Sequence, residues 1–234
     1  MVVKSAQTIS FLDPAVERLP ASGELSCDAP AKLSDLLRQL GTHAGLWACF
    51  AAPPPPCKTH PSHDVGRFLE DYQTQLLAPL EIPVIIRARS LAEKGFAREL
   101  IALDRDLTCA LPWPAFASAS RQVGRAQLER LRPLRDHRPL QRYLAAVHAG
   151  DASGWHSVVY GLTLAVYSLP LRHALLAYAR QTLTGLALAL AGDKLFHESS
   201  CQETLQILTN RIPAVIEQAL ADGCGSVQSV IKSP

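Results

Sequence analysis

The sequence predicts an all-α fold, a single globular bundle of roughly eight to ten helices. Alanine and leucine are abundant, whereas aromatic residues make up only 6% of the chain, and this composition suits packed helices better than sheets. Apolar residues recur at the i, i+3, i+4 spacing of a helix face, and no segment alternates convincingly as a strand would. Hydrophobic residues form 48% of the 234 residues, which is enough for a substantial core.

The segment 154–190 is the centre of the predicted fold. Its first half, 157–169, has no charged side chain, and a helix that is apolar on every side must be enclosed by other elements or lie in lipid. Pro170 ends this helix and suits the first turn of the next, which carries Arg172 and Arg180. Neither half has the roughly 20 consecutive apolar residues that a membrane span needs. We therefore expect the central helical hairpin of a soluble domain.

The remaining elements follow from local patterns. Leu33, Leu36, Leu37 and Leu40 form one apolar face, and similar stripes continue along the chain. Prolines and glycines separate the stripes, because proline lacks an amide donor and glycine tolerates turn conformations. The expected helices cover residues 32–40, 64–78, 84–92, 96–106, 115–131, 140–148 and 199–220. The expected interruptions are the proline run at 53–56, Pro79, Pro83, Gly95, a loop at 111–114, a basic turn at 132–139, and a kink at Pro213.

These elements predict one domain with two flanking segments. Residues 1–31 are rich in serine, proline and acids without periodicity, and are interpreted as a flexible arm. The helical domain covers 32–220, and 221–234 is a tail with glycine and serine.

Charge and cysteine usage exclude several classes of function. The net charge of +2 gives no dense basic face, so we expect no nucleic-acid partner. The N-terminus lacks the apolar core of a signal peptide, and the six scattered cysteines indicate reduced thiols rather than a disulfide framework. A cytoplasmic protein without a membrane segment is expected.

One cluster has the spacing of metal ligands. Cys57, His60 and His63 would suit zinc or nickel, since thiolate and imidazole are ligands of both. A fourth ligand for a closed site is not evident, and the segment is rich in proline. The alternative is a set of polar residues on a solvated loop, and we expect no requirement for these three in folding.

No catalytic constellation can be assembled from the sequence. Phosphate-loop, dinucleotide, HExxH and Gly-x-Ser-x-Gly patterns are absent. His156 and His173 begin the two central helices, where a partly buried structural histidine is commoner than a catalytic one. Glu198 and Glu203 near His197 are read as a solvated helix end. We therefore expect no enzyme activity, no catalytic residue and no cofactor.

Three motifs in order carry a family resemblance. Leu103-Asp104 is followed by Ala119-Ser-Arg-Gln-Val-Gly-Arg125, then by His156-Ser-Val-Val-Tyr-Gly-Leu162, then by Ala174-Leu-Leu-Ala-Tyr178. Phe68-Leu69 and Leu80-Glu-Ile-Pro-Val84 precede them in the expected order. Over roughly residues 33–220 the chain resembles the UreF family, all-helical urease accessory proteins. It is similar to a divergent member, because the family patterns are altered at 46–51, 117–118, 195–198 and 226–234.

The resemblance implies a function that the residues alone do not reach. It implies a non-catalytic, homodimeric maturation chaperone that bridges a urease-docking accessory protein and a nickel-carrying GTPase, regulates that GTPase, and so assists nickel insertion into the urease apoprotein. The positions it singles out as partner-contacting or structural are Ser120, Gly124, Arg125, His156, Gly161 and Tyr178. Two alternatives remain: a helical interaction module with a non-urease client, and an enzyme built around His156 or the Cys57 cluster.

Overall fold

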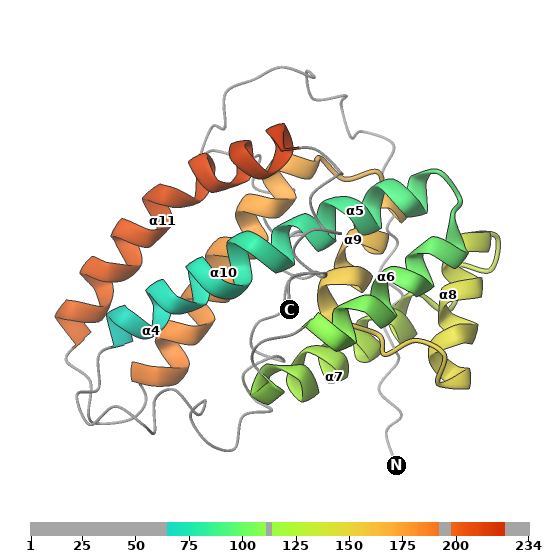
Figure 1. Ribbon diagram of the computed structural model, residues 1–234, viewed down its shortest axis with the longest axis horizontal. Helices are drawn as coiled ribbons and strands as arrows, with labels where there is room; N and C mark the ends of the chain where they lie inside the picture. The colour runs from blue at the N-terminus through green and yellow to red at the C-terminus, as the bar shows by residue number, and fades with distance from the viewer. Residues whose placement is uncertain (1–64, 111–113, 192–197, 223–234) are drawn as a thin grey trace, which may run out of the picture.

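The computed structural model describes residues 65–110, 114–191 and 198–222, and these residues form helices joined by short turns, with no strand among them (Figure 1). The predicted all-α class is therefore confirmed. The segments are α4 (Val65–Tyr72), the π-helix η1 (Gln73–Glu81), α5 (Ile82–Glu93), α6 (Ala97–Ala110), α7 (Pro114–Leu131), α8 (Arg138–Ala149), α9 (His156–Val166), α10 (Leu171–Ala191) and α11 (Glu198–Ala221).

The segments α4, η1 and α5 together form one helical rod, and the expected breaks at Pro79 and Pro83 are wrong. The segments α4, η1 and α5 follow one another without a gap, so the two prolines interrupt no helix. Pro79 lies inside the π-helix, whose wider turn relieves the clash between the proline ring and the preceding turn. Pro83 lies in the first turn of α5, where its missing amide donor is least costly. The described residues thus form fewer separate helices than the proline positions predict.

The other boundaries agree with the sequence to within a few residues. Gly95 makes the turn between α5 and α6 with φ of 77°, a conformation that glycine adopts without strain. Helix α9 ends earlier than expected, at Val166, because Ser168 adopts φ of 51° and the Leu169 amide donates to the Leu164 carbonyl. This 6→1 bond is the Schellman termination that usually places glycine at the left-handed position.

Several expectations fall on residues that the structure does not describe. These are the arm 1–31, the helix at 32–40, the proline run and most of the 111–114 loop. At the other end α11 continues through Pro213 to Ala221, so the expected tail is described only at its first two residues.

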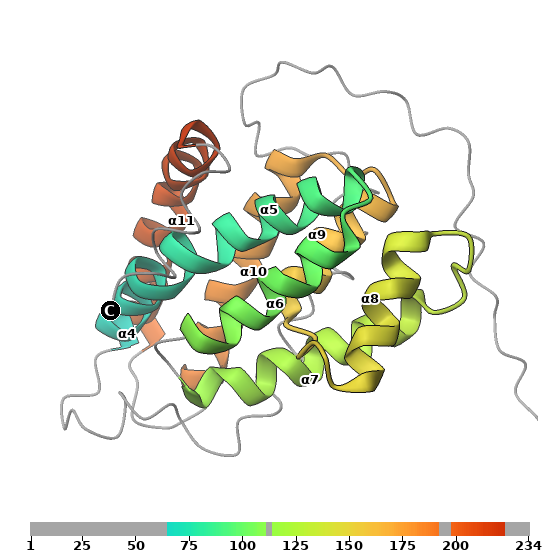
Figure 2. The same ribbon diagram turned by 45° about the vertical axis from the view of Figure 1, so that its right-hand side comes forward.

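Helix α9 lies at the centre of the molecule, as its apolar composition requires. It packs against α5 on one side and α7 on the other (Figures 1 and 2), and every residue from His156 to Leu164 is buried. Helix α10 packs mainly against α11 and α4. The expected central pair is therefore present, but each of its helices has its largest backbone interface with other helices. No helix in the described residues is long and apolar enough to cross a bilayer.

Candidate functional site

Several residues of the sequence motifs lie around the connection between α8 and α9, residues 150–155. Asp104 of α6 holds this connection in place through hydrogen bonds. Asp104 is completely buried, and its carboxylate accepts hydrogen bonds from the amides of Ser153, Gly154 and Trp155, the last two at 3.1 Å. The Tyr143 hydroxyl donates to the same carboxylate at 2.6 Å, and burial and then this anion raise the pKa of Tyr143. One side chain of α6 thus fixes both α8 and the start of α9.

Side chains of α6 and α7 hold the outer side of this connection. Arg105 Nε donates to the Asp151 carbonyl at 2.7 Å, and Arg125 Nε donates to the Ser153 carbonyl at 2.9 Å. The Arg121 guanidinium lies 5.4 Å from the centre of the Trp155 ring, within the range of a cation–π contact. The connection is therefore held to α6 and α7 by hydrogen bonds to its backbone and by the contact of Arg121 with the Trp155 indole.

Gly124 is required by the approach of α7 to the same connection. A Cβ at Gly124 would overlap the Gly154 carbonyl oxygen and lie 2.7 Å from the His156 amide nitrogen. Gly154 itself has φ of 76°, which other residues adopt only with strain. One turn before Gly124, the Ser120 hydroxyl accepts a hydrogen bond from the His156 amide at 3.3 Å and so caps the start of α9. The Ala-Ser-x-x-x-Gly-Arg motif is thus the α7 surface that receives the start of α9.

Gly161 lies where α9 crosses α5. A Cβ at this position would lie 2.6 Å from the Ile85 carbonyl oxygen, 2.8 Å from the Ala88 Cβ and 3.0 Å from the Arg89 amide nitrogen. The backbone of α5 occupies the space of a side chain, so the two helices can approach this closely only at a glycine.

His156 and Tyr178 belong to a buried aromatic cluster between α9 and α10. The His156 ring centre lies 5.6 Å from that of Tyr178 and 6.0 Å from that of Tyr160, and the two tyrosine rings are 4.9 Å apart. The Tyr160 hydroxyl donates to the Ala174 carbonyl at 3.0 Å. His156 is only 3% exposed, so a structural role fits its surroundings better than catalysis on a substrate.

Glu81, the last residue of η1, lies beside this cluster. The Tyr72 hydroxyl donates to the Glu81 carboxylate at 2.8 Å, and Tyr178 also hydrogen-bonds to it. Burial raises the pKa of Glu81 from 4.5 to about 7, although the two tyrosine hydrogen bonds act in the opposite direction. Burial and then the Glu81 charge raise the pKa of Tyr178 and of Tyr72. The cluster therefore holds one carboxyl group that titrates near neutral pH.

We expect Glu81→Gln to change how stability depends on pH. The folded state keeps the Glu81 proton up to a pKa of about 7, whereas the unfolded chain releases it near 4.5. The protonated Glu81 therefore contributes a stabilising free energy of order 1–3 kcal/mol. This contribution is fully present below pH 4.5 and is lost as the pH rises through about 7. Urea titrations across this pH window should show the free energy of unfolding of Glu81→Gln rising relative to that of wild type.

Glu70→Gln, an exposed change on the same rod, is the control. It should follow the wild-type pH dependence throughout. A constant difference between Glu81→Gln and wild type from pH 4 to pH 8 would contradict the assignment.

The candidate metal-ligating and acid–base residues of the sequence are only partly described by the structure. The described residues contain no group of three or more His, Cys, Asp or Glu that could hold a metal ion. Cys57, His60, His63 and His197 lie outside the described residues, so the metal-like cluster stays a hypothesis. His173 is half-buried in the first turn of α10, and Glu203 is exposed on α11.

The sequence motifs contain two central side chains, Asp104 and Glu81, whose roles are not predicted from the sequence. Asp104 shares a helix face with Leu100, Leu103 and Leu107, and a carboxylate on such a face indicates a buried acceptor. Glu81 likewise has the buried residues Leu77, Val84 and Ile85 at positions i−4, i+3 and i+4. In both cases the sequence signal is a charged residue within an apolar stripe.

One protein-family model matches the chain. It is described as UreF, and the match covers residues 59–191, which is more than half of the sequence. The matched range runs through the end of α10 and contains Asp104, Gly124 and Gly161. No curated protein matches the sequence.

Proposed function

Because this chain belongs to the UreF family of urease accessory proteins, we propose that it acts as a non-catalytic scaffold in nickel insertion into urease. In this proposal the chain bridges a urease-docking accessory protein and a nickel-carrying GTPase, and regulates GTP hydrolysis on the way to the urease apoprotein. It works in the cytoplasm as a homodimer. The nickel ion is cargo, and the chain needs no cofactor of its own.

The observation that carries the proposal is the family match over residues 59–191. The use of the motif residues supports a scaffold role, because Gly124, Gly161 and Tyr178 serve helix packing and lie in the interior. Their chemistry maintains a shape on which other proteins can dock. We propose that the terminal regions 1–31 and 221–234 take part in that docking, since segments of this composition can order on binding.

Deletion of the gene in the native host tests the role. We expect urease to accumulate as apoprotein, with most of its nickel missing when the purified enzyme is measured by inductively coupled plasma mass spectrometry. Urease subunit levels on immunoblots separate a maturation defect from a synthesis defect, and re-expression of the full chain should restore nickel.

Full nickel occupancy in the deletion strain would refute the urease role. The second candidate, a helical interaction module with another client, would then take its place. The altered patterns at 195–198 and 226–234 favour that candidate, because these are places where partner contacts are expected to differ. Purified nickel GTPase and docking factor should bind the full chain under the first candidate and fail to bind under the second.

A further inference from the structure

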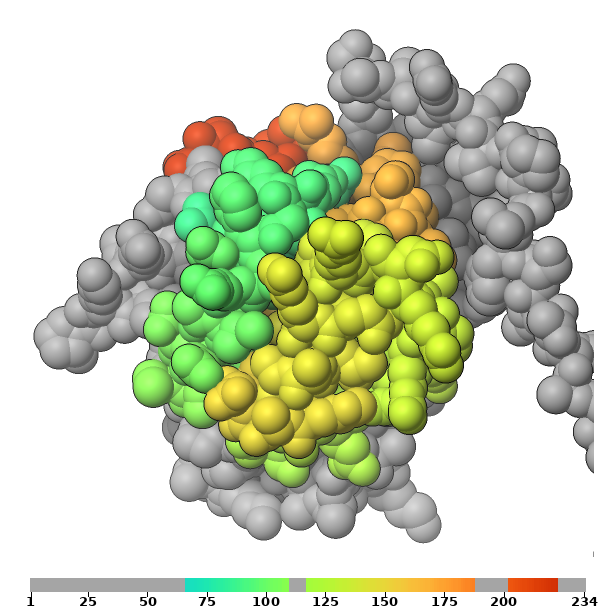
Figure 3. Space-filling model, turned by 90° about the vertical axis from the view of Figure 1, so that its right-hand side faces the viewer, coloured from blue at the N-terminus to red at the C-terminus, as the bar shows by residue number. Residues whose placement is uncertain are grey.

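The turn between α7 and α8 concentrates positive charge at one end of the molecule. Figure 3 looks onto this end, where α8 and the C-terminal part of α7, in yellow and yellow-green, occupy much of the surface. The segment 129–142 has two acidic residues, Glu129 and Asp136. Its exposed arginines are Arg130, Arg132, Arg135, Arg138 and Arg142.

Most of this charge is not neutralised within the described residues. Some arginines elsewhere have close acidic partners, as in Arg89–Glu93 and Arg172–Glu217, both at 2.8 Å. In the turn, Arg132 lies 3.8 Å from Glu129, and the same carboxylate also contacts His148. The other four arginines form no ion pair with any described residue, so their charge is available to a partner.

The backbone of the turn is held in one conformation. The Gln141 side-chain amide donates to the carbonyls of Arg132 and Leu134, at 3.3 and 3.0 Å. The Arg135 amide donates to the Pro133 carbonyl at 2.9 Å. A surface ordered in this way loses little further entropy when it binds a ligand.

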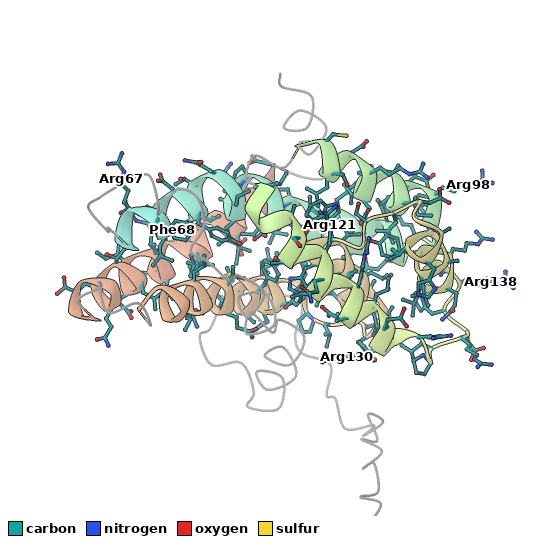
Figure 4. All side chains as sticks on the ribbon, turned by 90° about the horizontal axis from the view of Figure 1, so that it is seen from below. Arg67, Phe68, Arg98, Arg121, Arg130 and Arg138 are labelled. Carbon is teal, nitrogen blue, oxygen red and sulfur yellow. The ribbon has the colours of Figure 1, made fainter. Side chains whose placement is uncertain are left out.

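The turn and α8 line an open pocket of mixed character. Arg132, Arg135 and His148 supply polar groups, and Leu144 and Ala145 supply apolar carbon. Figure 4 shows Arg98 and Arg138 projecting from this end of the molecule, whereas Arg67 of α4 lies at the opposite end. The pocket thus places two arginines beside a small apolar surface, at an end of the molecule that carries further arginines.

We propose that this pocket docks an acidic segment of a partner protein that carries an apolar anchor residue. Carboxylates of the segment pair with the arginines of the turn, and the anchor packs on Leu144 and Ala145. Opposite charges of this kind increase the rate of encounter and fix the register of the bound segment. The inference goes beyond the proposed function, because it names a surface and a partner chemistry and holds whichever client the chain serves.

A protein segment fits this surface better than a nucleic acid does. The net charge of the whole chain is only +2, and these exposed arginines are confined to the short segment 130–142. A phosphate backbone would also leave the apolar part of the pocket without a partner. An anionic peptide with a leucine satisfies both parts.

Fluorescence anisotropy with the full chain tests the proposal. The probe is a fluorescein-labelled peptide in which leucines are spaced by pairs of aspartate and glutamate. The variants are the double change Arg132→Glu/Arg135→Glu and its matched control Arg67→Glu/Arg211→Glu, which changes the net charge equally on exposed residues of α4 and α11. Circular dichroism of each variant verifies that it is folded.

We expect the turn variant to bind the acidic peptide about tenfold or more weakly, because two favourable charge contacts become repulsive. The control should remain within about twofold of wild type, as expected for distant charges screened by salt. The single change Ala145→Glu, also at an exposed residue, should weaken binding by blocking the apolar anchor.

Three outcomes would overturn the proposal. The first is no detectable binding of the acidic peptide to wild type. The second is an equal loss in the turn variant and in the control, which would mean non-specific attraction to net charge. The third is tighter binding of a single-stranded oligonucleotide that is lost in the turn variant, which would assign the surface to nucleic acid. None of these outcomes bears on the nickel content of urease, so the proposed function is tested separately.

Discussion

Asp104→Ala is expected to lower the free energy of unfolding by at least about 3 kcal/mol, because it leaves several buried donors without an acceptor. The three backbone amides at residues 153–155 cannot turn toward solvent without moving the start of α9, and the Tyr143 hydroxyl loses the same partner. Chemical denaturation followed by circular dichroism measures the loss. If alanine prevents folding, Asp104→Asn gives a measurable intermediate, since one amide oxygen still accepts.

Asp106→Ala is the matched control for this change. Asp106 lies on the same helix but is exposed, so its removal should alter stability by less than about 0.5 kcal/mol. Equal denaturation midpoints for Asp104→Ala and wild type would show that the carboxylate does not hold the α8–α9 connection.

The second large effect is expected at Gly161. In an open helix, alanine in place of glycine would add about 1 kcal/mol of stability. Here the new Cβ would lie 2.6 Å from the Ile85 carbonyl oxygen, so Gly161→Ala should instead cost about 1–3 kcal/mol. Gly161→Leu should cost more, because the whole side chain must displace the backbone of α5, and Gly161→Asp adds a buried charge.

Thermal and urea unfolding of the Gly161 series measure these costs. Ala126→Leu, at an exposed position of α7, controls for the added leucine and should be nearly neutral. A stabilised Gly161→Ala variant would mean that α5 can move away from α9 and that the glycine is not needed for the contact.

The sequence predicts a helix well where one face is apolar and a glycine marks the end of the helix. The stripe of α6, the uncharged run of α9 and the stop at Gly150 all follow from spacing and from backbone preference. The enclosure of α9 also follows, since an uncharged helix must be covered. The close approach at Gly161 fits its position as well, because a glycine inside an apolar helix costs stability unless packing requires it.

The features that sequence reasoning misses depend on tertiary partners. A proline normally ends a helix, and only the π-helical turn explains why Pro79 does not. Asp104 receives its donors from residues far along the chain, at 143 and 153–155, and no local pattern brings these together. The pKa of Glu81 likewise depends on burial beside Tyr72 and Tyr178, which belong to different helices.

The π-helix η1 has a consequence for how the long rod tolerates changes in length. A π-helical turn holds more residues than an α-helical turn, so Gln73–Glu81 takes up surplus chain between two α-helices that keep their own orientations. Loss of a single residue from this stretch can be absorbed by tightening the segment toward α-helix, while the packing faces of α4 and α5 keep their directions. The same loss within α5 would rotate the following residues by one helical step and move the surface that meets Gly161 away from α9. Alignment gaps between this chain and other members of its family should therefore be better tolerated in η1 than anywhere else along the rod.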